Sequence, residues 1–246
     1  GPDNYIALMP GVLMGTGAPC SGRFEAITKS PLTGIMVASS CGGPFGMAFK
    51  TAGWDGLIIT GRADTPTLLE ITDQGVAFKD AGALWGKEIP EVQSILDTKG
   101  SKSLVIGPAG ENKVRFANLA AGHRFLGRGG IGAVMGAKNL KAIVATGGNF
   151  VIRPHDPVKF KRLCKTATGY INQNPLSADR YRNYGTSANV KPCNQAMILP
   201  VNNFQDGQDE VAVKVFGETM AKEHDTRHHT CKPCTTPKGW CRAIYT

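Results

Sequence analysis

Residues 127–136 read GRGGIGAVMG, and this stretch decides between a doubly wound α/β fold and an α+β fold. It contains the G-x-G-x-x-G spacing that, in dinucleotide-binding domains, directly follows a strand, opens a helix and has an acidic residue about 20 positions further on. What precedes it here is GHRFL (122–126), and the first acid in the required region is Asp156, after a proline-containing loop. We therefore exclude a doubly wound dinucleotide-binding fold.

Short apolar or alternating runs around this stretch predict a β-rich domain over residues 1–150. The expected strands are 5–9, 24–28, 56–60, 67–71, 75–78, 103–106, 114–119 and 140–146, and the expected helices are 45–52 and 88–97. So many short strands with so few helices between them do not fit a regular βαβ repeat. The predicted fold class is therefore α+β, with a mixed β-sheet and short helices in residues 1–150.

Residues 151–246 are expected to begin a second, mainly helical domain. Apolar residues recur on one face of 156–172, which predicts a helix, and 210–221 predicts another. Residues 173–208 are rich in Asn, Pro and Gln and are expected to form a long loop. A cysteine-rich segment, 224–246, follows at the end of the sequence.

Composition limits the class of protein. The 246 residues are 41% hydrophobic and 19% charged, which fits a soluble globular chain and excludes a disordered one. No apolar run approaches the roughly 20 residues that a membrane span needs, and the N-terminus does not read as a signal peptide. We therefore expect a cytoplasmic, reducing setting and no membrane partner. In that setting a C-x-x-C pair indicates metal or redox chemistry rather than a disulfide framework.

Three glycine-rich stretches share a chemistry suited to phosphate. They lie at 15–23, 39–46 and 122–130, and two of them carry arginines, at Arg23 and at Arg124 with Arg128. Consecutive backbone N–H groups in such turns form anion-binding concavities, and guanidinium groups add forked donors. One such loop is ordinary and is often only a tight packing turn. Three of them indicate a common polyanionic ligand, which the net charge of +9 also suits.

Cys231 and Cys234 form a C-x-x-C pair, and Cys241 follows seven residues later. This spacing suits an iron–sulfur cluster, which usually takes four thiolates. The available fourth ligands are Cys20, Cys41, Cys164 and Cys193, most of which we expect to be packing residues. Zinc is the competing interpretation, because His224, His228 and His229 lie just upstream. The third interpretation is that Cys231 and Cys234 are incidental surface thiols.

Taken together, these loops resemble the aldehyde ferredoxin oxidoreductase family of tungsten- or molybdenum-pterin enzymes. The matching stretches are GTGAPCSGR (15–23), TKSPLTG (28–34), CGGPFGMAFKTAGWDGLIITGRA (41–63), LWGK (84–87), IGPAGEN (106–112) and GHRFLGRGGIGAVMGAKNLKAI (122–143). They cover nearly all of residues 1–150 in order, so the combination is specific although each piece alone is weak. The resemblance implies a fragment of a protein more than twice as long.

The resemblance implies two pterin dithiolenes on one tungsten (or molybdenum), with a [4Fe–4S] cluster nearby. Arg23 matches an arginine between pterin and cluster, and Ser40 stands where the family often has Asn. The implied cofactor-binding residues are Arg23, Ser40, Gly42, Arg124, Phe125, Gly127 and Arg128. Among them Arg124, Gly127 and Arg128 match contacts to the pterin phosphates. A Mg²⁺ ion would bridge those phosphates through the main-chain carbonyls of Ser40 and Phe125.

The implied activity is oxidation of an aldehyde to a carboxylic acid, with electrons relayed through the cluster to a ferredoxin-like acceptor. The same resemblance is compatible with assembly of the enzyme as a homo-oligomer. The family's third cluster cysteine falls at Lys238 here, so Cys241 is the expected substitute for that metal ligand. The family's catalytic acid/base residues lie beyond this chain, so we expect no catalytic residue in it and no activity of the fragment alone.

A non-enzymatic, zinc-binding basic module that contacts nucleic acid is the alternative. Aromatic residues make up only 7% of the chain, and the arginines lie in glycine turns rather than on a stacking surface. We therefore expect no nucleic-acid partner.

Overall fold

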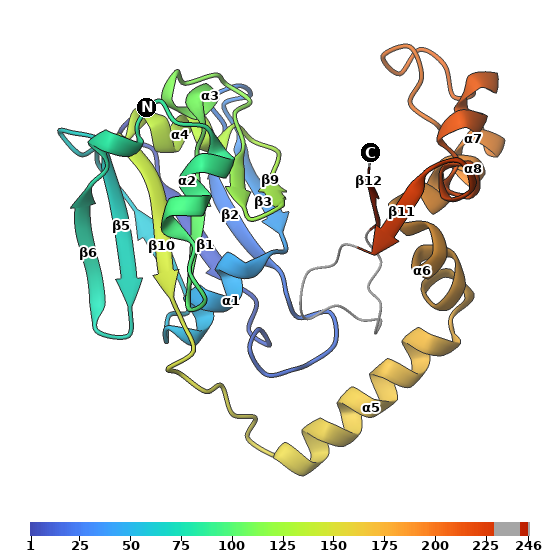
Figure 1. The fold of residues 1–246 in the computed structure, drawn as a ribbon, viewed down its shortest axis with the longest axis horizontal. Helices are drawn as coiled ribbons and strands as arrows, with labels where there is room; N and C mark the ends of the chain where they lie inside the picture. The colour runs from blue at the N-terminus through green and yellow to red at the C-terminus, as the bar shows by residue number, and fades with distance from the viewer. Residues whose placement is uncertain (229–241, 246) are drawn as a thin grey trace. The chain divides into compact units, whose positions relative to one another are not determined.

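The structure is a computed structural model, and it describes residues 1–228 and 242–245. The chain divides into two compact units, residues 1–154 and 155–246, which we call the first and second units (Figure 1). The first unit holds two β-sheets and short helices, and the second is mainly helical. The predicted α+β fold class is confirmed.

Sheet A of the first unit is antiparallel, with strand order β3-β2-β1-β4. Its strands are β1 (Ile6–Pro10), β2 (Phe24–Lys29), β3 (Met36–Cys41) and β4 (Leu57–Ile59). Alternation explains which face is buried: Ile6 and Leu8 point into the core, while Met9 is exposed. The other face of sheet A is therefore open in this structure.

Sheet B has six strands in the order β6-β5-β10-β7-β8-β9. They are β5 (Thr67–Thr72), β6 (Gly75–Asp80), β7 (Ser101–Val105), β8 (Leu119–Ala121), β9 (Arg124–Leu126) and β10 (Leu140–Thr146). Only the β5–β10 pair is parallel. Every residue of β10 except the last is buried, which matches its continuous apolar run between two covered faces.

Two helices join the sheets into one core. Helices α1 (Pro44–Thr51) and α4 (Ile131–Ala137) each contact strands of both sheets, and α3 (Pro108–Glu111) packs on α4. The ring of Phe45 lies 5.5 Å from that of Phe24 and 5.9 Å from that of Phe49, centroid to centroid. The 3₁₀ turn η1 (Gly82–Leu84) and helix α2 (Ile89–Leu96) cover the outer face of sheet B.

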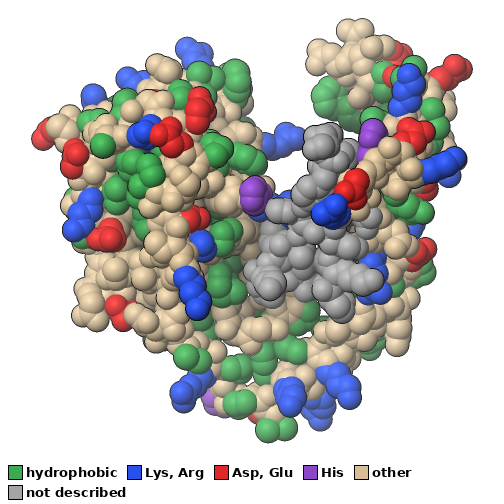
Figure 2. Space-filling view, in the orientation of Figure 1, with side chains coloured by type: hydrophobic (Ala, Val, Ile, Leu, Met, Phe, Trp, Pro, Cys, Tyr) green, Lys and Arg blue, Asp and Glu red, His purple; other side chains and the backbone are tan. Residues whose placement is uncertain are grey.

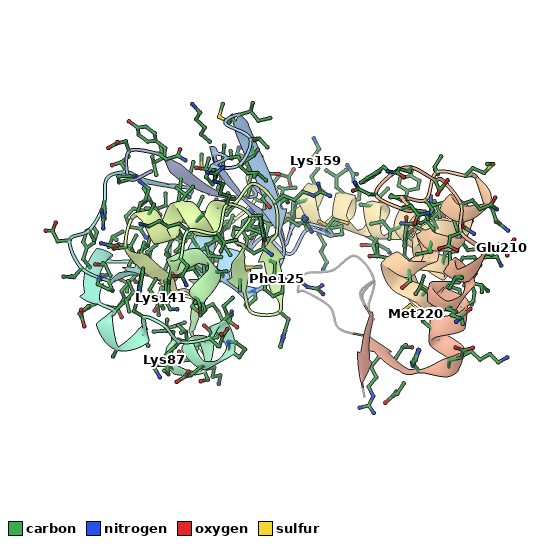
Figure 3. The ribbon with its side chains drawn as sticks, turned by 90° about the horizontal axis from the view of Figure 1, so that it is seen from above. Lys87, Phe125, Lys141, Lys159, Glu210 and Met220 are labelled. Carbon is green, nitrogen blue, oxygen red and sulfur yellow. The ribbon has the colours of Figure 1, made fainter. Side chains whose placement is uncertain are left out.

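A buried ion pair fastens three segments of the first unit together. Lys141 on β10 pairs with Glu111 at the end of α3, and its Nζ also donates to the Lys87 carbonyl at 2.9 Å. The other carboxylate oxygen of Glu111 accepts from the Gly86 N–H at 2.9 Å. Figure 3 labels Lys87 and Lys141. The segments LWGK, IGPAGEN and NLKAI therefore meet at one polar network whose groups are all hydrogen-bonded. This shared network is one physical reason why the three segments occur in the same chain.

The second unit begins with helix α5 (Pro157–Gln173), where Asp156 caps the first turn by accepting from the Lys159 N–H at 2.9 Å. Short elements follow: a π turn η2 (Leu176–Arg180), α6 (Tyr181–Tyr184), a 3₁₀ turn η3 (Gly185–Asn189), α7 (Val190–Gln195), a 3₁₀ turn η4 (Glu210–Val215), α8 (Gly217–Glu223), and the strands β11 (Asp225–His228) and β12 (Arg242–Tyr245). The prediction of one long loop over 173–208 is wrong, because 176–195 is helical throughout.

Other predictions in the first unit also fail. Residues 114–118 form no strand, and β8 begins only at Leu119. Strand β9 does precede the glycine stretch and α4 does follow it, so the local strand–loop–helix order exists. However, β9 and β10 are separated in the sheet by β8 and β7 and run antiparallel, so they build no βαβ unit. The exclusion of a dinucleotide-binding fold therefore rests on topology.

Candidate functional site

The residues implied as cofactor ligands gather where the two sheets meet. β3 is an outer strand of sheet A, β9 is an outer strand of sheet B, and the two lie side by side (Figure 1). We call this place the β3–β9 edge. It comprises Arg23, Ser40, Gly42, Arg124, Phe125, Gly127 and Arg128. Segments about 100 positions apart in the sequence thus form one continuous surface.

Arg23 is fixed against β3 by two hydrogen bonds. Its Nε donates to Ser40 Oγ at 3.0 Å, and its Nη2 donates to the Ser40 carbonyl at 2.8 Å. The antiparallel pairing of Glu25 with Ser40 brings the start of β2 beside the end of β3, which makes these contacts possible. The guanidinium is therefore held at the edge while the residue remains exposed.

The turn between β3 and α1 packs backbone against backbone on the β8–β9 hairpin. Gly43 has φ +108°, and a Cβ there would lie 2.6 Å from the Ala121 carbonyl oxygen and 3.4 Å from Arg124 Cβ. Only glycine allows both this conformation and this approach. The same Gly43 is the N-cap of α1, so it offers no capping side chain. The positive end of α1 therefore lies next to Arg124.

Arg124 to Arg128 form the second half of the edge. Phe125, labelled in Figure 3, is 51% exposed at the rim of the first unit. The Arg128 N–H lies 3.4 Å from Ser39 Oγ, its hydrogen-bond acceptor. In the amide orientation that satisfies both of its ends, Asn118 donates to the Gly127 carbonyl at 2.9 Å. Strand β3 and the α3–β8 segment therefore both hold this loop in place.

The glycines of this loop divide into two kinds. A Cβ on Gly129 would lie 2.4 Å from Val37 Cγ2, and one on Gly130 would lie 2.0 Å from the Arg115 carbonyl oxygen. Both also have positive φ, so they are packing glycines. No protein atom lies within 4 Å of the corresponding point at Gly127 among the described residues. Only Gly127 therefore leaves room for a ligand to approach the backbone.

The arrangement fits a polyanion. Arg23, Arg124 and Arg128 lie along one edge with the N-terminus of α1, which has no capping side chain, and with the open backbone at Gly127. Phosphate groups are bound in this way by charge-assisted hydrogen bonds and by helix N-termini. The carbonyl of Ser40, a predicted magnesium ligand, already accepts from the Arg23 guanidinium. Its second lone pair could ligate a cation, but that cation would lie beside the guanidinium charge, which repels it.

The predicted metal ligands Cys231, Cys234 and Cys241 lie outside the residues that the structure describes, as does Lys238. Within the described part of the chain, no group of three His, Cys, Asp or Glu residues is arranged to hold a metal ion. Of the four other cysteines, Cys41 is buried, Cys20 is exposed, and Cys164 and Cys193 are half-buried. We expected most of these four cysteines to be packing residues, and Cys41 is the one of them that is buried.

An apolar groove of about 300 Å³ lies at the opposite edge of the first unit, between β4 and strands β5 and β6. Lys138 lies at this groove, and its Nζ donates to the Pro2 carbonyl at 2.6 Å and to the Gly61 carbonyl at 2.8 Å. Burial lowers the pKa of Lys138, and the nearby Asp3 carboxylate opposes that change. The sequence patterns considered above gave no sign of this groove. It contains none of the residues of the β3–β9 edge.

No helix in residues 1–228 is both long and apolar enough to cross a bilayer.

Known proteins resemble this chain over nearly its whole length. It is 43% identical to the tungsten-containing aldehyde ferredoxin oxidoreductase of Pyrococcus abyssi, covering 99% of this chain and 40% of that protein. It is 31% identical to the aliphatic sulfonate oxidoreductase, WOR-like subunit, of Pyrococcus furiosus, covering 88% of this chain and 37% of that one. Among solved structures, the active site complex BamBC of benzoyl coenzyme A reductase matches with a TM-score of 0.76 and 27% identity, covering 99% of this chain and 41% of that one.

The chain thus spans about two fifths of the length of these relatives. The family model for the aldehyde ferredoxin oxidoreductase N-terminal domain matches residues 1–147, and the model for domains 2 and 3 of the same family matches residues 162–242. The first match covers most of the first unit, including every residue of the β3–β9 edge. The chain belongs to the aldehyde ferredoxin oxidoreductase family.

Proposed function

We propose that this chain is the cofactor-holding part of a tungstopterin oxidoreductase and that its β3–β9 edge binds the pterin phosphates. The observation that carries the proposal is that Arg23, Arg124 and Arg128 lie along the same edge as the open backbone at Gly127. The tungsten-containing relatives support the identity of the metal. When bound, such a cofactor supplies two-electron redox chemistry at the metal.

The residues of the edge have separate tasks in this proposal. Arg124 and Arg128 donate to phosphate oxygens, and Gly127 lets those oxygens approach the main chain. Arg23 lies between pterin and cluster, with its guanidinium oriented by Ser40. The main-chain carbonyls of Ser40 and Phe125 would hold a magnesium ion, which would neutralise part of the phosphate charge close to the Arg23 guanidinium.

The complete enzyme would oxidise a small aldehyde to a carboxylic acid. Electrons would leave singly through a [4Fe–4S] cluster on Cys231, Cys234, Cys241 and a fourth ligand, toward a ferredoxin-like acceptor. The general acid or base would come from polypeptide outside this chain. Relatives named for sulfonate and benzoyl coenzyme A chemistry share the fold, so the substrate class must be established by assay. Metal analysis of the complete protein separates this proposal from a zinc-binding module, because it predicts tungsten, iron and sulfide.

The decisive test compares arginines at the two edges of the first unit. In the complete protein, Arg124→Ala and Arg128→Ala should each lower pterin occupancy, since each removes charge-assisted hydrogen bonds worth about 1.5–3 kcal/mol. Arg62→Ala is the matched control, because Arg62 lies at the apolar groove on the opposite edge. Pterin is measured by fluorescence after release, tungsten by mass spectrometry and folding by circular dichroism. Full pterin content in both test variants, or equal loss in the control, would show that the edge does not bind the cofactor.

A further inference from the structure

Helix α5 carries a strongly one-sided distribution of charge. Its 17 residues contain Lys159, Lys161, Arg162 and Lys165 but no Asp or Glu. All four basic residues are exposed. Figure 2 shows lysine and arginine side chains gathered where Figure 1 draws α5, and Figure 3 labels Lys159 on this helix. The phosphate-binding proposal uses none of these cations.

The basic residues occupy one side of the helix. At 3.6 residues per turn, Lys161, Arg162 and Lys165 fall on one face, with Lys159 at its border. Phe160, Cys164, Ala167 and Ile171 fall on the opposite side, and all four are half-buried. We call the first side the basic face of α5. Val158, which is 82% exposed, also lies on the basic face, and Leu163 and Tyr170 on the other side of the helix are 53% and 70% exposed. The basic face is therefore the side of α5 that carries its exposed charge.

The basic face is unfavourable for the helix itself. All four cations lie in the first nine residues of α5, at the positive end of its dipole, where negative charge would stabilise it. Lys161 and Lys165 are also like charges at the i,i+4 spacing, which destabilises a helix by roughly 0.2–0.5 kcal/mol. No acidic residue within the helix offsets this repulsion. The four basic residues therefore do not stabilise α5, and their presence needs another explanation.

We propose that the basic face of α5 is the docking surface for an acidic protein, namely the electron acceptor of the complete enzyme. The inference rests on the proposed function and deepens it by naming the surface that the acceptor meets. The charge complementarity favours a small, anionic carrier protein, because the cations and the helix dipole together attract negative charge. Electron-transfer contacts are small and transient, so a patch of this size suffices.

An anionic membrane is the competing partner for a basic amphipathic helix. A helix that lies on a membrane buries its apolar side among the lipids, with its cations near the headgroups. On the apolar side of α5, Phe160, Ala167 and Ile171 are half-buried, and Leu163 and Tyr170, 53% and 70% exposed, are what remains to enter lipid. Two partly exposed side chains are a small anchor for a membrane helix, so the structure favours a protein that meets the basic face.

The test uses two double variants of the complete protein that change its net charge equally. Lys161→Glu with Lys165→Glu reverses the basic face. The control, Lys214→Glu with Lys222→Glu, reverses two exposed lysines elsewhere in the second unit. An acidic ferredoxin serves as the protein probe and benzyl viologen as the small-dye acceptor. The measurements are the Kd for ferredoxin at several salt concentrations, by interferometry, and the KM for each acceptor during aldehyde oxidation.

We expect the basic-face variant to raise the Kd and KM for ferredoxin roughly tenfold at low salt, with a smaller salt dependence. Dye-linked turnover should stay unchanged, and the control should change ferredoxin binding less than about threefold. Equal changes in both variants, or unchanged ferredoxin binding in the first, would overturn the inference. Loss of sedimentation with anionic phosphatidylserine vesicles at unchanged Kd would also overturn it and assign the face to a membrane.

A different result would contradict the proposed function. If the wild-type protein oxidises no aldehyde with the dye as acceptor, the proposed reaction is wrong. The interferometry still decides whether the basic face binds an acidic protein.

Discussion

The two units differ in what holds them together. Among the described residues, all buried hydrophobic side chains lie in the first unit except those of Ala188 and Ala212. Both units expose some large apolar side chains, such as Phe78 at 75% in the first unit and Val158 at 82% in the second. Burial of apolar surface is the main favourable contribution to folding. The first unit therefore has a core of its own, whereas the described part of the second unit buries little apolar surface.

Helix starts show the same contrast. In the first unit, the N-cap residues of α1, α2 and α4 make no side-chain capping hydrogen bond, and these helices are placed by packing. In the second unit, α5 contains no buried residue and Asp156 caps its start, while α6, α7 and α8 also begin without a side-chain cap. A local capping signal thus marks α5, whereas packing places α1, α2 and α4. The contrast suggests three tests of decreasing size.

The largest effect is expected from truncating a matched pair of valines. Val92 in α2 is 0% exposed, and Val158 in α5 is 82% exposed. Val92→Ala should lower the free energy of unfolding of the first unit by about 2–3 kcal/mol, because it removes buried methyl groups and leaves a cavity. Val158→Ala should be neutral or slightly stabilising, because alanine is the better helix former. Urea unfolding of this chain, followed by tryptophan fluorescence and circular dichroism, measures both.

Similar losses from the two valine variants would contradict the contrast. They would mean that α5 is as well packed as α2 and that the second unit has a core of its own.

A smaller effect is expected at the helix starts. Asp156→Ala should destabilise α5 by about 1 kcal/mol, since it removes the acceptor for the Lys159 N–H. Glu88→Ala is the control, because Glu88 holds the N-cap position of α2 without a capping hydrogen bond. Amide hydrogen exchange in the first turn of each helix reports the change. Faster exchange at α2 than at α5 would show that the cap is not what defines α5.

This contrast also explains what sequence reasoning could reach. β10 was predictable because LKAIVAT is a continuous apolar run between turn residues, and α5 was predictable from its apolar period and cap. β3 was missed because MVASSC consists mostly of small or polar residues. α4 was missed because its buried residues cover every side of the helix, which leaves no amphipathic period. The π, α and 3₁₀ elements of 176–195 are short and differ in residues per turn, so no single hydrophobic period marks them in the sequence.

The β3–β9 edge could be predicted only in part. The residue types of Arg23, Arg124 and Arg128 indicated a phosphate ligand, and the family resemblance named the same positions. Their proximity follows from the pairings β2–β3 and β8–β9 and from the contact between the two sheets, none of which spacing in the sequence reveals. Gly129 and Gly127 looked alike in the sequence, and what separates them is the positive φ of Gly129 and its packing against Val37.

The smallest effect concerns a buried cation that belongs to the first unit alone. Lys138 is 2% exposed, and burial lowers its pKa in the folded state, against the opposing charge of Asp3. Between this lowered pKa and the ordinary value of about 10.4, the unfolded chain binds more protons than the folded chain. The free energy of unfolding should therefore rise with pH across this window, as the penalty for burying the ammonium disappears. Below the window, both states are protonated and the full penalty remains.

Two variants test that sign in opposite directions. Lys138→Gln keeps a donor for the Pro2 and Gly61 carbonyls but removes the titrating charge, so the rise in stability with pH should disappear. Asp3→Asn removes the group that opposes the effect of burial, so the window should widen and the rise should increase. Urea unfolding between neutral pH and pH about 10.5, near the ordinary lysine pKa, measures both. A fall in stability across this range that Lys138→Gln abolishes would mean that the ammonium stabilises the folded state, and that the contacts of Lys138 with the two carbonyls outweigh its desolvation.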